Sequence, residues 1–393
     1  MLHTGAREGA CYYPFAAQTH VVSSDESEGM INVGIDVHKR RYQACLKDEE
    51  GHLIGEVSFP RDEEGIRSSR RLLQNHGEAK IVLESTGNLS VPIYDNLTKD
   101  SANRVILANP RKTRIIAEAK IKNDRIDARV LAEVVRADLV AESYVPNKEV
   151  REQRALLRER RSLVEDTVAI KNRIHSLLDR YNLKHEYSDL FGKQGREWLR
   201  GLQLPSTEKT ILDVELRQLE SLEAGIRTLT EKIAIEAAEE PRVRLLMGFT
   251  GIDYYSAMLL LAEIGDIKRF SSPKKLVAYA GLAPGMRSSA GMTVRGHITK
   301  EGNKYLRWIL IEAAQHASRF DPKLQGFYQR VSTKHGRQRA IVGVARKLLV
   351  SIYHVLNRNE TYHGQRPELL ERKIGNLQRI ADSSLQEGRD NQQ

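Results

Sequence analysis

Four carboxylates occupy positions where an acidic side chain has few routine structural uses. Asp36 ends an apolar segment at residues 31–36, and Glu84 ends another at residues 80–84. Asp124 and Asp127 lie three residues apart near the start of a segment with helical spacing, so both project from one helix face. Four such groups repel one another strongly unless a cation lies between them, and Mg²⁺ is the oxygen-binding cation that we expect first. The pattern therefore predicts a catalytic Mg²⁺ site.

The chemistry predicted for this site is phosphodiester transfer. Two divalent ions about 4 Å apart activate an attacking oxygen and stabilise the leaving oxygen of a phosphodiester. Each acid alone is more often a solvated surface residue, and Asp124 stands where a helix N-cap is expected. The two strand-end positions and the spacing of the aspartates together favour the metal site over these ordinary roles.

A serine pair, Ser288 and Ser289, lies in a segment rich in glycine and proline and is followed by basic residues. One interpretation is that this segment binds a phosphate, and composition alone favours it. The other is that one serine attacks a phosphodiester and conserves the bond as a phosphoseryl ester, which allows strand exchange without ATP. The residues predicted to bind nucleic-acid phosphates are Arg287, Arg295, His297, Lys300, Lys304 and Arg307.

Positive charge is concentrated in one part of the chain. The 393 residues contain 62 Lys and Arg against 52 Asp and Glu, a formal charge of +10. Residues 241–358 contain 20 basic and 6 acidic side chains, a net charge of +14, so the remainder carries −4. A segment this basic favours a polyanionic partner, and DNA comes first because neutralised phosphates release counterions. The alternative is that the charge only solubilises the surface.

The composition is that of a globular protein with two or three domains, since 40% of the residues are hydrophobic and 29% are charged. Cys11 and Cys45 are too few for a disulfide framework and lack the spacing of a zinc site. We find no secretory signal, and no apolar run approaches the roughly 18 residues that cross a bilayer. We therefore expect a cytoplasmic, DNA-associated protein without a membrane partner.

Residues 30–145 predict an α/β domain with an RNase H-like sheet. Strands are expected at 31–36, 42–47, 53–59, 80–84 and 104–108, with a helix at 62–75 and a short helix from Val91. The first and fourth strands are neighbours in this fold, which brings Asp36 close to Glu84. An actin-like ATPase shares the strand order, but it needs a glycine two residues after the acid, where this chain has His38. No GxxxxGK[ST] phosphate-binding loop occurs either.

The rest of the chain predicts two helical parts. In residues 146–240, apolar side chains recur every seven residues from Leu156 to Leu177 and from Leu212 to Ile233, which indicates a coiled-coil arm, a dimer contact or a packed hairpin in one subunit. Residues 241–358 predict a mostly α-helical domain, in which the turn at 248–253 resembles a helix-hairpin-helix element that can hold a phosphate. Residues 1–29 are predicted to be a disordered extension, and residues 359–393 a polar tail that frays.

Several motifs in a fixed order resemble the IS110 family of transposases, which belong to bacterial insertion sequences. The resemblance extends from about residue 31 to residue 356. Because the motifs occur together in the family's order and spacing, the resemblance is far more specific than any one motif. The motifs are GIDVHK at 34–39, LESTG at 83–87, NP at 109–110, KND at 122–124, DA at 127–128, GLAP at 281–284 and GHITKEGN at 296–303.

The resemblance implies a RuvC-like nuclease domain, a coiled-coil arm and a transposase domain with a serine nucleophile. Its Asp-Glu-Asp-Asp set corresponds to Asp36, Glu84, Asp124 and Asp127. Family loops often carry Ser-Gly, whereas this chain has Ser-Ser-Ala-Gly, so the family pattern favours Ser289 and leaves Ser288 open. It also implies a homo-oligomer, a dimer or tetramer, in which the acidic site of one subunit and the serine of another form a composite site.

The resemblance also implies nucleic-acid partners. These are the DNA of the element ends and target and, as in several family members, a structured non-coding guide RNA. The leading interpretation is thus a Mg²⁺-dependent DNA transposase. The alternatives are a RuvC-like structure-specific endonuclease that uses water as the nucleophile, and a nucleic-acid-binding protein with a degenerate acidic site. The complete carboxylate set argues against the last of these.

Overall fold

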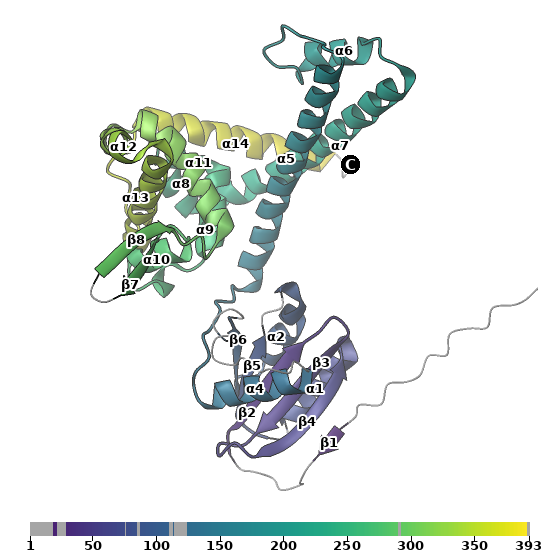
Figure 1. Cartoon of the computed structure of the whole chain (residues 1–393), viewed down its shortest axis with the longest axis vertical. Coiled ribbons are helices and arrows are strands. Elements are labelled where there is room, and N and C mark those ends of the chain that lie inside the picture. The colour runs from purple at the N-terminus through teal and green to yellow at the C-terminus, as the bar shows by residue number, and fades with distance from the viewer. Residues whose placement is uncertain are drawn as a thin grey trace, which may run out of the picture. The chain divides into compact units, whose positions relative to one another are not determined.

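The computed structural model describes residues 19–21, 29–74, 76–84, 87–109, 113, 124–289 and 292–390. The chain divides into two compact units, Met1–Val145 and Pro146–Gln393 (Figure 1). Each unit has hydrophobic cores of its own. The first unit contains the predicted carboxylates, and the second contains the predicted serine segment.

The first unit is built on a six-stranded mixed sheet. Its strands are β1 (Thr19–Val21), β2 (Ile31–Val37), β3 (Arg41–Lys47), β4 (Leu53–Pro60), β5 (Ala79–Glu84) and β6 (Asn103–Ala108), in the spatial order β1-β4-β3-β2-β5-β6. Strands β2, β3 and β4 form an antiparallel meander, whereas β5 and β6 run parallel to β2. The five strands predicted beyond residue 30 lie within one residue of their predicted ends, and the strand order is consistent with an RNase H-like domain.

Two faces of this sheet are covered by helices. The described helices of the unit are α1 (Glu63–Gln74), the 3-10 helix η1 (Gly87–Ser90), α2 (Val91–Leu97) and α4 (Asp124–Arg136). Alternate residues of a strand point to opposite faces. Ile31, Val33 and Ile35 of β2 therefore share a core with side chains of α1 and α2. The intervening positions, which include Gly34 and Asp36, face α4.

Gly34 allows α4 to lie directly against the sheet. A Cβ atom at this position would lie 2.2 Å from the carbonyl oxygen of Ala128 and 2.3 Å from the amide nitrogen of Ala132, both in α4. Any side chain would therefore push the helix away from β2. This close approach fixes the position of the first turn of α4 relative to the end of β2.

The second unit begins with a helical arm. Its helices are α5 (Lys148–Arg180), α6 (Lys193–Gly201) and α7 (Ser206–Glu239), and α5 and α7 pack side by side (Figure 1). Leu163 of α5 packs against Gly225 of α7, where a Cβ atom would lie 3.3 Å from its Cδ1. Arg173 donates two hydrogen bonds to Glu215, at 2.7 and 2.8 Å. The two apolar seams therefore meet within a single chain.

The remainder of the second unit packs around α9, in which every residue is buried. Phe249, Leu310 and Leu348 are among the side chains that share its core. Its other elements are α8 (Pro241–Met247), α9 (Tyr254–Ile264), η2 (Ile267–Arg269), α10 (Pro273–Tyr279), the hairpin of β7 (Pro284–Ser289) and β8 (Met292–Ile298), α11 (Lys304–Phe320), α12 (Pro322–His335), α13 (Arg337–Arg358) and α14 (Pro367–Asp390).

Two expectations from the sequence are corrected here. Part of the extension at 1–29, predicted to be disordered, forms β1 and pairs with β4. The tail predicted to fray is the helix α14, which buries Leu377 and Ala381. Helix α13 has the length and composition of a helix that could cross a membrane, a test that the core helix of a globular domain also passes. Its residues Val344, Leu348 and Ile352 are buried in the core of the second unit.

Candidate functional site

The predicted carboxylates gather at one edge of the sheet in the first unit. Asp36 lies near the end of β2, is 3% exposed, and points to the face that α4 covers. The parallel register aligns the ends of β2 and β5, so Asp36 and Glu84 end neighbouring strands. Asp124 and Asp127 lie in the first turn of α4. The close packing of α4 on β2 brings this turn to the same edge.

His38 joins two of these carboxylates. Its Nε2 atom lies 2.8 Å from Oδ2 of Asp36 and 3.1 Å from Oδ1 of Asp124. The guanidinium of Arg41 donates to the other oxygen of Asp124 at 2.5 Å. Asp36, His38 and Asp124 each offer one ligand atom, and these three atoms lie within 4.8 Å of one another. Such a group of oxygen and nitrogen donors fits a divalent cation.

The two aspartates of this group ionise differently. Burial raises the pKa of Asp36 above its ordinary value, His38 opposes that shift, and the charges of Asp127 and Asp124 raise the pKa further. A hydrogen bond from Arg41 lowers the pKa of Asp124. A buried carboxylate that is repelled by two others is costly to ionise without a counter-charge. The electrostatics therefore favour a cation at this edge.

Glu84 and Asp127 lie beside this cluster rather than within it. Among the described residues, the ligand atoms that meet within 4.8 Å at this site come from Asp36, His38 and Asp124. Glu84 is half-buried at the adjacent strand end, and Asp127 is close enough for its charge to affect the pKa of Asp36. The four predicted acids thus lie at the same edge of the sheet. Two of them, Asp36 and Asp124, both contact His38.

The two predicted serines lie at the end of β7, in the second unit. Ser288 pairs with Thr293 and Ser289 pairs with Met292 across the hairpin. Ala290 and Gly291, between the strands, and the side chains of both serines fall outside the described part of the chain. The serines that the sequence placed in a loop therefore have the backbone of a strand beside the tip of a hairpin.

The predicted phosphate-binding residues have different surroundings. His297, Lys300 and Lys304 are exposed, and Lys300 adopts a left-handed backbone conformation with φ of 53°. Arg307 is half-buried and donates from Nη1 to the carbonyl oxygen of Ala280 at 3.0 Å. The side chains of Arg287 and Arg295 fall outside the described part of the chain.

A buried carboxylate fixes the base of this hairpin. Glu263 is fully buried and receives hydrogen bonds from Nε and Nη2 of Arg158, in α5, at 2.7 and 2.8 Å. Asn303 donates to the same carboxylate at 2.6 Å and accepts hydrogen bonds from the amides of Tyr305 and Leu306. The segment between β8 and α11 is therefore attached to the arm.

Sequence reasoning missed His38, Arg41 and Glu263. His38 lies in the turn between β2 and β3, two residues after Asp36, and this short spacing to a strand-end acid was the available signal. Arg41 begins β3, and its partner Asp124 is 83 residues away in sequence. Glu263 lies in an apolar helix, where a carboxylate must have a buried partner.

Two family models match the chain. A model of the DEDD transposase of IS110 matches residues 33–183, and a model described as the transposase IS116/IS110/IS902 family matches residues 243–329. Together they cover more than half of the chain. The first match contains the four carboxylates, and the second contains the serine hairpin and the turn at 248–253.

Curated relatives are similar over most of the chain. The transposase for insertion sequence element IS1111A of Coxiella burnetii is 26% identical over 347 residues, which are 84% of this chain and 90% of that protein. The transposase for insertion sequence element IS1533 of Leptospira borgpetersenii is 28% identical over 246 residues, which are 61% of this chain and 70% of that protein. Both matches thus extend beyond any single motif.

Proposed function

The chain belongs to the IS110 family of transposases, and we propose that it cuts and rejoins the DNA of an insertion sequence with a metal site in its first unit and a serine in its second. The observation that supports this division most directly is the cluster of Asp36, His38 and Asp124, whose ligand atoms lie within 4.8 Å of one another. A buried acid at the end of a central strand has no comparable structural use.

Mg²⁺ would be held by the four carboxylates of Asp36, Glu84, Asp124 and Asp127. His38 would orient the carboxylate of Asp36. When bound, the cation supplies charge neutralisation and polarises phosphodiester oxygens. Burial of Asp36 excludes water from one side of the site, and Arg41 keeps Asp124 ionised by its hydrogen bond. Asp124 is therefore presented as an ionised ligand, and the cation would supply the counter-charge that the buried Asp36 needs.

Ser289 is our preferred nucleophile, with Ser288 as the alternative. Its Oγ would form a bond to phosphorus while the bond from phosphorus to one strand breaks, and the serine proton would pass to the leaving oxygen. The hydroxyl of a second strand would then attack the phosphoseryl ester, which regenerates the serine and rejoins DNA. The number of phosphoester bonds is conserved, so no ATP is required. Exposed Lys300 and Lys304 would hold backbone phosphates nearby.

Further parts of the proposal follow from the family. The arm formed by α5 and α7 would act as a coiled coil that joins subunits into a dimer or tetramer, and one subunit's carboxylates would then work with another subunit's serine. The turn at 248–253 would act as a helix-hairpin-helix element on DNA. A structured RNA would pair with target and donor DNA.

The test is to trap a protein–DNA adduct that survives denaturation. Wild-type protein, Ser289→Ala and Ser288→Ala are incubated with DNA of the element ends in Mg²⁺, then denatured and separated. We expect Ser289→Ala to lose the adduct and Ser288→Ala to retain it. Loss only in Ser288→Ala would transfer the role to that serine. Strand exchange undiminished in both variants would contradict a serine nucleophile, and cleavage without any adduct would favour a RuvC-like endonuclease that uses water.

A further inference from the structure

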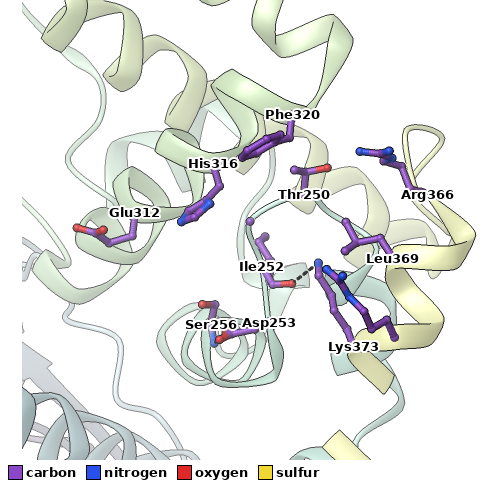
Figure 2. A pocket seen from close by; sticks show the side chains of 12 residues that line it. Thr250, Ile252, Asp253, Ser256, Glu312, His316, Phe320, Arg366, Leu369 and Lys373 are labelled. Atoms are coloured by element: carbon purple, nitrogen blue, oxygen red, sulfur yellow. Dashed lines mark hydrogen bonds between the residues drawn. The ribbon is translucent and has the colours of Figure 1, made fainter. Parts of the chain in front are cut away.

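A cavity of about 540 Å³ opens in the second unit between the turn at 248–253, α11 and α14 (Figure 2). One wall is formed by Glu312, His316 and Phe320, which recur every four residues along α11. The opposite wall is formed by Arg366, Leu369, Arg372 and Lys373. This volume lies within the range of pockets that take a small organic ligand. It is therefore large enough for one nucleotide.

The wall formed by Arg366 and the start of α14 carries positive charge that no ion pair neutralises in the described part of the chain. Arg366 and Arg372 are exposed, and neither forms an ion pair with a carboxylate in the described part of the chain. The charge of Asp253 acts on Lys373 of the same wall, but no ion pair joins an acidic residue of the lining to Arg366 or Arg372 in the described part of the chain. Asp253 accepts a hydrogen bond from the amide of Ser256 at 2.8 Å as the N-cap of α9, and Glu312 points away from α14 in Figure 2. An anion that enters the cavity would meet two free guanidinium groups.

The α11 wall carries an exposed aromatic ring. Phe320 is 56% exposed, which is unusual for a large apolar side chain, and His316 lies one turn before it. An exposed aromatic face beside positive charge is a stacking platform for a nucleobase. A base inside a duplex already stacks on its neighbours, so this ring favours an unpaired one.

The two walls are held in place by contacts with the turn between them. Lys373 donates from Nζ to the carbonyl oxygens of Met247, Phe249 and Ile252 at 2.8, 2.9 and 2.7 Å, which attaches α14 to the turn. Gly251 has φ of +85°, and a Cβ there would lie 2.6 Å from a carbonyl oxygen of α11. The cavity is therefore formed before any ligand binds.

We propose that this cavity binds one nucleotide of an unpaired nucleic-acid strand, with its phosphate at Arg366 and Arg372 and its base against Phe320. The proposal rests on the proposed function, because a transposase that cuts and exchanges strands exposes unpaired nucleotides. A free mononucleotide has the same chemistry, and only the strand supplies further phosphates to the basic surface of the unit.

The experiment measures fluorescence anisotropy of full-length protein with a labelled single-stranded oligonucleotide and with its duplex, in EDTA to prevent cleavage. We expect Phe320→Ala to raise the Kd for the single strand by about 5-fold to 150-fold and to leave the duplex Kd within about twofold. Leu385→Ala, which removes another exposed apolar side chain, is the matched control. An unchanged single-strand Kd, or equal losses on both forms of DNA, would overturn the proposal.

A second pair of variants tests the phosphate contacts. The double variant Arg366→Ala with Arg372→Ala should reduce the slope of log K against log salt for the single strand by about 0.7 for each phosphate that the protein no longer neutralises. Arg379→Ala, an exposed arginine further along α14, is the control and should leave the slope unchanged. An unchanged slope in the double variant would overturn the phosphate assignment, and displacement of the strand by micromolar mononucleotide would overturn the strand assignment.

Mg²⁺-dependent cleavage by the wild-type protein separates this proposal from the proposed function. If Phe320-dependent binding is present and no cleavage or adduct forms, the transposase proposal fails and the cavity assignment stands. If cleavage occurs and Phe320→Ala binds single strands normally, the cavity assignment alone fails.

Discussion

The imidazole of His38 lies 2.8 Å from the carboxylate of Asp36, and the same Nε2 atom reaches Asp124 at 3.1 Å. One side chain from the turn after β2 therefore connects the strand end to the first turn of α4. An imidazole in this position can ligate a cation or orient the carboxylates that do, and both roles make cation affinity depend on His38.

His38→Ala should weaken the binding of Mg²⁺ or Mn²⁺ by about 10-fold to 100-fold, because residues that ligate or orient ligands commonly contribute that much. Isothermal titration calorimetry of the full-length protein measures this change. The control is His52→Ala, which removes the histidine of another pair, at 3.0 Å from Asp48 in an exposed turn of the same unit. Equal losses in both variants would show that the effect is not specific to the site.

Asp36→Asn and Glu84→Gln should each abolish cleavage while leaving DNA binding within about twofold, because only the negative charge is removed. Asp36→Asn should also maintain or increase stability, since burial and the neighbouring aspartates make the ionised form of Asp36 costly. Gel-based cleavage and filter binding measure the first effects, and urea unfolding measures the last. Persistent cleavage in Asp36→Asn would remove this residue from the site.

Gly34→Ala should destabilise the first unit by about 1–3 kcal/mol, as expected for an overpacked interior. The new Cβ would lie 2.2 Å from the backbone of α4, which must then move and carry Asp124 with it. We expect faster hydrogen exchange in α4 and weaker cation binding. Gly29→Ala is the control, since its Cβ would meet its nearest neighbour at 3.5 Å. Wild-type exchange rates in Gly34→Ala would contradict the close packing.

Acid should loosen α4 through Glu133. Hydrogen bonds from Arg136 and Lys47 lower the pKa of Glu133 from 4.5 to about 2. The folded state therefore holds this proton less tightly than the unfolded state, so the stabilisation is present above pH 4.5 and is lost as pH falls toward about 2. The protection of the α4 amides against hydrogen exchange, relative to the intrinsic rate at each pH, should decrease over this range. The decrease should be smaller in Glu133→Gln. Glu142→Gln, at an exposed pair with Arg104, is the control.

The strands around the site could be predicted from sequence because their signals are local. Alternating apolar residues and turn residues define β2 to β6, and a buried strand that ends in an acid marks Asp36. The contact from Arg41 to Asp124 spans 83 residues and could not be predicted, since it depends on how α4 packs on β2. Gly34 permits that packing, but a glycine in a strand has several uses.

The C-terminal helix shows a signal that was present and overlooked. Leu370, Ile374, Leu377 and Ala381 recur at helical spacing and pack on or within the core, whereas the remaining residues of α14 are mostly polar. The overall composition of the segment is polar and hides this apolar stripe. The helical spacing of its apolar residues reveals the stripe. The same helix carries Lys373, so the tail contributes a wall of the cavity in the second unit.

Glu263→Gln should destabilise the second unit by about 1–3 kcal/mol, because it removes a fully buried carboxylate that accepts two hydrogen bonds from the half-buried guanidinium of Arg158. Glu215→Gln is the matched control: Glu215 also receives two hydrogen bonds from one arginine, but Arg173 is exposed, so we expect a loss of at most about 1 kcal/mol. Urea unfolding followed by tryptophan fluorescence measures both. Because Asn303 joins Glu263 to the segment after β8, Glu263→Gln should also slow adduct formation at temperatures where the protein remains folded. Similar losses of stability in the two variants would show that burial of the carboxylate does not determine the strength of this contact.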